Sequence, residues 1–252
     1  MVDIHAHILP GIDDGAGDIY DALEMAKIAA NSGVKTIVAT PHCNIPGMFN
    51  NYFSDALIEV FKNTEKAIKE EGIDIQLCPG MEVFATSDLP RLLTDGKIMT
   101  LNQSRYLLVE FSFDEDPGYA MHILDKITEL GVKPVIAHAE RYEFIQDDPS
   151  IAYQMRRKGY WIQINKGSIL GKFGRRAWDT TWKLLDHQLV SVVASDAHSP
   201  FQRTPYLKNA YDELKNEISD EYRKRLFEYN PANICNNKQP MAQKPIPFDD
   251  NY

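Results

Sequence analysis

Two histidines near the N-terminus could bind one metal ion together. His5 and His7 stand in the stretch D-I-H-A-H-I-L-P-G-I-D-D-G, residues 3–15. In an extended strand, residues two apart point to the same face, so both imidazoles would approach one point. The Pro-Gly pair would end the strand in a turn, which would present Asp13 and Asp14 as oxygen ligands. His-x-His also occurs by chance, so the interpretation depends on the rest of the chain.

Other potential metal ligands recur where predicted strands end. They are His42 after 34–40, Glu82 at the end of 75–82, Glu110 late in 106–111, His138 at the end of 132–138, and Asp196 and His198 after 189–195. The carboxyl ends of parallel barrel strands share one rim, where barrel active sites are built. Buried carboxylates there would repel each other and lose hydration unless cations neutralise them. The pattern therefore predicts a metal site.

The elements between these positions predict an α/β fold. Helices with apolar residues at helical spacing are expected after each strand and near the C-terminus, at about 18–32, 54–71, 88–93, 119–130, 149–158, 175–187, 207–215 and 220–229. With a further strand at 160–165, seven strand-then-helix units imply parallel pairing with right-handed crossovers. An open doubly wound sheet or a closed barrel would fit. No G-x-G-x-x-G or G-x-x-x-x-G-K-[ST] motif is present, which favours a distorted (β/α)7 barrel, similar to a TIM barrel, as a single domain.

Composition restricts the partners. The chain has 252 residues and a net charge of -9 without a basic run, which argues against nucleic-acid binding, including an exonuclease role. No apolar run approaches the roughly 20 residues needed for a membrane span, and no signal peptide is visible, so a cytoplasmic protein without membrane insertion is expected.

Three cysteines without C-x-x-C spacing argue against a disulfide framework. None is followed by the arginine of a C-x-x-x-x-x-R loop, which excludes cysteine phosphatase chemistry. Residues 236–252 are predicted to be a mobile tail after a domain that covers 1–235.

The donor types indicate which metals fit. Nitrogen and oxygen donors without thiolate suit Mn²⁺ best, with Fe²⁺ or Zn²⁺ as alternatives. The nine candidates exceed what one ion needs, so two or three ions that share Glu82 are expected. Ions about 3.5 to 4 Å apart are suited to in-line attack on phosphorus.

Arginines and aromatic residues near the ligands suggest a phosphate ester as substrate. Arg141 and Arg203 follow candidate histidines closely and could grip phosphate oxygens, although each alone could be a surface residue. Lys166 is a weaker candidate. Several aromatic residues could stack on a phenyl ring or serve as core: Phe49, Tyr52, Phe113 and Tyr142.

The motifs, taken in order, resemble a known family. They are H-A-H-I-L-P-G-I-D-D-G, T-P-H at 40–42, P-G-M-E at 79–82, H-A-E-R-Y at 138–142 and S-D-A-H-S-P at 195–200. With them the chain resembles the PHP (polymerase and histidinol phosphatase) superfamily, and most closely its bacterial manganese-dependent protein tyrosine phosphatases of capsule and exopolysaccharide synthesis. The resemblance covers about 1–235. It implies a distorted seven-stranded barrel with three ions, held by His5, His7, Glu82 and Asp196; by Glu82, Glu110 and His138; and by Asp14, His42 and His198.

The resemblance also implies a reaction and a partner. The implied substrate is phosphotyrosine on the C-terminal tail of a bacterial tyrosine kinase, hydrolysed by metal-activated hydroxide while Arg141 and Arg203 hold the phosphate. Many superfamily members have histidine at the positions of Asp14 and, in some cases, Glu110; carboxylates there match the tyrosine phosphatase branch. Two alternatives remain: a small-molecule phosphomonoesterase of histidinol phosphatase type, and an inactive metal-bound adaptor of the kinase tail. The oligomeric state is not predicted.

Overall fold

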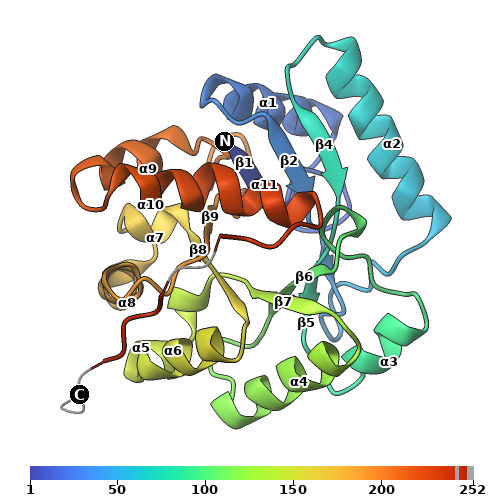
Figure 1. Ribbon diagram of the computed structural model, residues 1–252. Helices are drawn as coiled ribbons and strands as arrows, with labels where there is room; N and C mark the ends of the chain where they lie inside the picture. Colours follow the sequence, from blue (N-terminus) through green and yellow to red (C-terminus); the bar gives the residue numbers. More distant parts are fainter. Residues whose placement is uncertain (242–243, 249–252) are drawn as a thin grey trace.

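Parallel strands form the centre of the molecule (Figure 1). The computed structural model describes residues 1–241 and 244–248. Its strands are β1 Val2–Ala6, β2 Thr36–Ala39, β3 His42–Cys43, β4 Gln76–Pro79, β5 Glu82–Phe84, β6 Tyr106–Glu110, β7 Lys133–Ile136, β8 Trp161–Asn165 and β9 Val192–Ala194. They pair in parallel as β1-β2-β4 and as β3-β5-β6-β7-β8-β9.

The two sheets are parts of one distorted barrel. β3 continues β2 after Pro41, which cannot donate to the ladder, and β5 continues β4 after Gly80. Glycine is required there, since a Cβ on Gly80 would lie 2.8 Å from Val38 Cγ1. At the other edge, His7 N donates to Ala197 O over 2.8 Å, which connects the chain after β9 to β1. Because each interrupted pair acts as one bent strand, the predicted distorted (β/α)7 barrel is confirmed.

Helices surround the strands (Figure 1). They are α1 Ile19–Asn31, α2 Asp55–Glu70, α3 Leu89–Thr94, α4 Pro117–Glu129, α5 Glu143–Asp147, α6 Ser150–Arg157, α7 Lys166–Ile169, α8 Gly174–Asp186, α9 Lys208–Glu213, α10 Asp220–Lys224 and α11 Asn230–Cys235. The Asp18 carboxylate caps α1, and the Ser54 hydroxyl caps α2, at the two positions where the sequence predicts these helices to begin. The sequence does not predict α5, α7 or α11, because four to six residues carry too little periodicity.

Helix α11 lies across one end of the barrel (Figure 1). Its Ile234 and Cys235 belong to the buried apolar cluster that contains Ile4, Leu108 and Val135 from three strands. This cluster fills the barrel interior below the strand ends. The candidate metal ligands lie beyond this cluster, toward the carboxyl ends of the strands.

Described residues of the predicted mobile tail contact the rest of the protein. Met241 N donates to Asn230 Oδ1, Ile246 N donates to His187 O, and the Phe248 ring stacks on His187 with centroids 3.7 Å apart. Residues 242–243 and 249–252 lie outside the described residues, and the mobility of the tail stays a prediction. Within the described ranges, no helix has both the length and the apolarity to cross a bilayer.

Candidate metal centre

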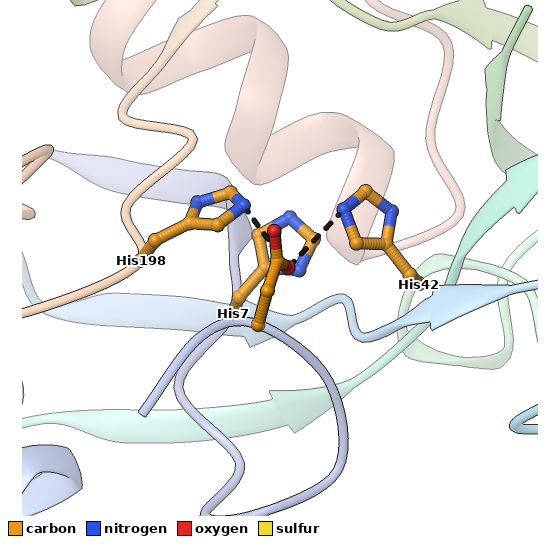
Figure 2. Close-up of side chains that lie close together, drawn as sticks. His7, His42 and His198 are labelled. Carbon is orange, nitrogen blue, oxygen red and sulfur yellow. Dashed lines mark ion pairs between the residues drawn. The ribbon is translucent and has the colours of Figure 1, made fainter. Parts of the chain in front are cut away.

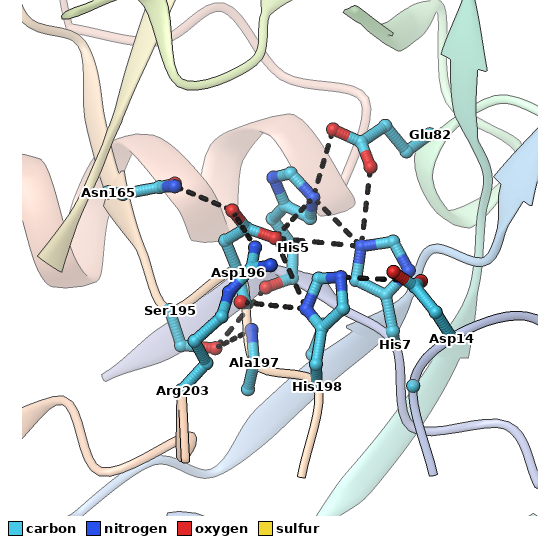
Figure 3. A network of polar contacts seen from close by, with 12 residues as sticks. His5, His7, Asp14, Glu82, Asn165, Ser195, Asp196, Ala197, His198 and Arg203 are labelled. Atoms are coloured by element: carbon cyan, nitrogen blue, oxygen red, sulfur yellow. Dashed lines mark hydrogen bonds and ion pairs between the residues drawn. The ribbon is translucent and has the colours of Figure 1, made fainter. Parts of the chain in front are cut away.

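The nine candidate ligands come together at the carboxyl ends of the strands. Figure 3 shows part of this group: His5, His7, Asp14, Glu82, Asp196 and His198. Donor atoms lie within 4.8 Å of one another in three groups: His7, Asp14, His42 and His198; His5, His7 and Asp196; and His42, Glu82 and Glu110. His138 joins them, since its Nε2 is 2.9 Å from Glu82 Oε1. Shared members connect the three groups into one cluster.

A bulge in β1 directs both N-terminal histidines into the cluster. One extra residue lies between Asp3 and Ala6 relative to β2. Ile4 consequently packs in the apolar interior, while the Nε2 atoms of His5 and His7 approach to 3.3 Å. Two ring nitrogens at this distance need a proton or a cation between them, because their lone pairs repel.

Acceptors behind the rings determine which nitrogens face the cluster. Asp13 Oδ2 lies 2.7 Å from His7 Nδ1, and Gln163 Oε1 lies 3.0 Å from His5 Nδ1. Gln163 Oε1 also accepts from His138 N, which identifies it as the oxygen. Both Nδ1 atoms therefore carry the proton, and both Nε2 atoms present lone pairs to the cluster. Asp13, which the sequence suggested as a further oxygen ligand, accepts a hydrogen bond from the candidate ligand His7.

Strand β8 contributes positioning residues that the sequence analysis missed. Gln163 Nε2 donates to Asn165 Oδ1 over 2.8 Å, and Asn165 Nδ2 donates to Asp196 Oδ2 over 2.6 Å. Glu140 Oε1 accepts from Asn165 N over 3.1 Å. The signal was visible, since W-I-Q-I-N places two amides two residues apart in an otherwise apolar, buried strand. These amides connect the ligands of different strands.

Glu82 lies at the centre of the cluster and is fully buried. Its Oε1 lies 3.1 Å from His5 Nε2, and its Oε2 lies 3.3 Å from His7 Nε2 and 3.0 Å from His42 Nδ1. Within the described part of the chain, Oε2 nevertheless receives no hydrogen bond of acceptable geometry. A buried carboxylate oxygen surrounded by nitrogens that do not donate to it is suited to a shared cation.

The outer part of the cluster is open to solvent. Figure 2 shows His7, His42 and His198 around a carboxylate. Asp14 Oδ1 lies 3.5 Å from the Nε2 atoms of both His42 and His198. The side chain of Asp14 is 56% exposed. The other ring nitrogen of His42, Nδ1, faces inward and lies 2.9 Å from the buried Glu110. A metal ion or a substrate could thus enter the cluster beside Asp14.

The buried charges of the cluster shift one another's pKa values. Burial by itself would raise the pKa of Glu82, but His5 and His42 hold it well below its usual range. Burial and the Glu82 charge raise the pKa of Glu110. Burial would lower the pKa of His42, but Glu82 and the hydrogen bond to Glu110 raise it to about 10. Protons thus supply the positive charge that divalent cations could supply instead. The nitrogen and oxygen donors of the cluster are of types that bind such cations.

Both predicted arginines lie at the cluster. Arg203 Nη2 is 2.5 Å from Asp196 Oδ2 (Figure 3). Arg141 Nη1 is 3.9 Å from the same oxygen. The Arg141 guanidinium lies between two rings, 4.3 Å from the centroid of Phe113 and 4.5 Å from that of Phe173. Both arginines line a cavity of about 210 Å³ with seven of the nine candidate ligands. They can therefore reach a group bound at the ligands.

The remaining candidates have different places. Lys166 lies outside this cavity and donates to Tyr206 O over 2.9 Å. Phe49 stacks on His42, and Tyr142 is buried with its hydroxyl accepting from the backbone, as a core residue does. Tyr52 donates its hydroxyl proton to Asn44 Oδ1.

Three residues of the site have left-handed backbones. His138, Asp196 and Arg203 have φ values of 33°, 50° and 50°. Residues other than glycine rarely adopt this left-handed region of backbone angles. Such strain persists where the surrounding structure enforces it. The turns after β7 and β9 are thus held in the shape that directs these side chains toward the cluster.

The chain is similar in sequence and in fold to known proteins. The family described as "Capsular polysaccharide synthesis, CpsB/CapC" matches residues 1–236. The tyrosine-protein phosphatase YwqE of Bacillus subtilis is 36% identical over 98% of this chain and 96% of its own. The tyrosine-protein phosphatase CpsB of Streptococcus pneumoniae is 33% identical over 93% and 98%. A crystal structure from work on YwqE and CpsB, which describes them as metal-dependent tyrosine phosphatases, superposes with a TM-score of 0.92 at 36% identity, covering 99% of this chain and 100% of that one.

Proposed function

The chain belongs to the CpsB/CapC family of capsular polysaccharide synthesis and is a metal-dependent tyrosine-protein phosphatase, and from this premise we propose its substrate and the roles of its residues. The substrate is phosphotyrosine on the C-terminal tail of a bacterial tyrosine kinase that regulates capsule or exopolysaccharide synthesis. The observation that supports this most is the placement of Arg141 and Arg203 over one cluster of nitrogen and oxygen donors.

Two or three divalent ions would occupy the cluster, with Mn²⁺ first and Fe²⁺ or Zn²⁺ as alternatives. The proposed sets are His5, His7, Glu82 and Asp196; Glu82, Glu110 and His138; and Asp14, His42 and His198. His42 Nδ1 also lies close enough to Glu82 and Glu110 to serve the second set. When bound, the ions supply a water of lowered pKa as nucleophile and positive charge against the phosphate.

The arginines would bind the phosphate. Arg141 is held between Phe113 and Phe173, which limits its rotation and leaves its N–H groups for phosphate oxygens. Arg203 is fixed by Asp196, so its charge remains at the cavity. Both would stabilise the negative charge that develops as the phosphorus–oxygen bond to the phenol breaks. A phenolate, with a pKa of about 10, needs less protonation to leave than an alkoxide.

We also propose a cytoplasmic location. Cys43, Cys78 and Cys235 are buried free thiols, a state that a reducing compartment maintains.

The test is elemental analysis of the purified protein combined with phosphate release from a phosphotyrosine peptide and from histidinol phosphate. We expect bound Mn²⁺, faster turnover of the peptide, and loss of activity on chelation with recovery on Mn²⁺ addition. Faster turnover of histidinol phosphate would favour the small-molecule phosphatase. Peptide binding without phosphate release from the metal-loaded protein would favour the adaptor.

A further inference from the structure

A second cavity lies directly beside the metal centre. It has a volume of about 430 Å³ and shares Arg203 with the cavity that contains the candidate ligands. Its other walls come from α7 and the residues after it, including Lys166, Lys172 and Phe173, and from the loop around Phe201. The proposed roles of the metal centre do not use this cavity.

The charge of this cavity is opposite to that of the whole chain. Three cationic side chains line it, and none of its lining residues is a carboxylate, although the chain carries a net charge of -9. Lys166 is only 6% exposed and donates to Tyr206 O, which leaves two of its three N–H groups. Lys172 is exposed, and no acidic side chain in the described ranges pairs with it. The cavity is therefore suited to a carboxylate.

The Phe173 ring joins this cavity to the phosphate site. It lines the cavity and lies under both arginines, 4.5 Å from the Arg141 guanidinium and 5.7 Å from that of Arg203. Its position requires glycine at residue 167, where a Cβ would lie 2.6 Å from Phe173 Cε2. A phosphate held by the arginines would consequently lie near the mouth of the second cavity.

We propose that this cavity binds the side chain of an aspartate or glutamate one or two positions from the phosphotyrosine in the substrate peptide. This inference rests on the proposed function. An extended peptide advances about 3.3 Å per residue, so a neighbouring side chain can reach a cavity that shares a wall residue with the phosphate site. Phe201, 83% exposed at the rim, provides apolar surface for the peptide next to that side chain.

The test compares phosphotyrosine peptides that differ only in glutamate or glutamine at one of the four flanking positions. It uses the metal-loaded full chain, the Lys172→Glu variant, and Lys62→Glu as a matched control. Lys62 is an exposed lysine on α2 that does not line the cavity. Free phosphotyrosine, which has no flanking residue, reports the catalytic reaction alone.

We expect kcat/KM to be about fivefold higher for the best glutamate peptide, as for a moderately strong ion pair. Lys172→Glu should abolish or invert this preference and leave turnover of free phosphotyrosine unchanged, while Lys62→Glu should retain the preference. Equal rates for glutamate and glutamine peptides, or a preference that survives Lys172→Glu, would overturn the subsite. Absence of metal-dependent hydrolysis of free phosphotyrosine would overturn the proposed function itself, so the two failures are distinguishable.

Discussion

His5 donates a hydrogen bond from Nδ1 to Oε1 of Gln163 over 3.0 Å, across 158 positions of the chain. The contact fixes the tautomer of His5, so that Nε2 faces the other candidate ligands. The same amide oxygen accepts from His138 N. One side chain of β8 thus orients candidate ligands of β1 and of the turn after β7.

Gln163→Met removes this acceptor and nearly conserves volume. We expect Mn²⁺ affinity to fall by about 10- to 100-fold, because His5 loses the partner that holds its tautomer. Equilibrium dialysis of the metal-free protein measures this. Gln154→Met, at an exposed position of α6, is the control and should bind like wild type. Unchanged affinity in Gln163→Met would contradict the positioning role.

His138→Ala and Arg141→Ala should differ in kind. The first removes a proposed ligand, so metal content and activity should fall together. The second should retain its metal and lose about 100-fold or more in kcat, as when a donor to developing negative charge is removed. Metal analysis and kinetics on one preparation separate the two. Turnover near wild type in Arg141→Ala would show that the phosphate assignment is wrong.

Metal uptake should release protons. Burial would lower the pKa of His42, but Glu82 and Glu110 raise it to about 10 in the metal-free protein, so its ring is protonated at pH 7. A bound cation must displace that proton. Calorimetric titration with Mn²⁺ at pH 7 in buffers of different ionisation enthalpy should therefore show net proton release.

The same shift predicts how the stability of the metal-free protein depends on pH. The folded-state pKa of His42 lies above the unfolded value of about 6.5, so its stabilising contribution is complete below pH 6.5 and is lost as pH rises through 10. Urea unfolding of the metal-free protein should show a decline over this window that His42→Gln reduces. An identical decline in the variant would contradict the assignment.

Ile234→Ala tests whether α11 closes the barrel. Ile234 is fully buried against the interior cluster, and its truncation should lower the free energy of unfolding by about 3 kcal/mol. Urea denaturation measures the change. Ile246→Ala, at a position that is 42% exposed, should cost much less.

Local sequence patterns are enough to predict much of the fold. Alternating strands and helices, capped at Asp18 and Ser54, follow from periodicity and end signals that act within a few residues. The interruption of the predicted strand 75–82 at Pro79-Gly80 also follows from local residue types and is confirmed by the separate β4 and β5. The sequence could not predict the short α11, because that helix depends on what the distant chain places against it.

The sequence by itself determined which donors stand at strand ends, because the two-residue period of a strand and the shared direction of parallel strands are set locally. Only the tertiary structure decided how these donors meet. The bulge in β1, the pairing of His7 with Ala197 and the amides of Gln163 and Asn165 join segments far apart in the chain. Such contacts exist only once the barrel closes, since closure brings β9 against β1 and makes one cluster of side chains that are separate in the sequence.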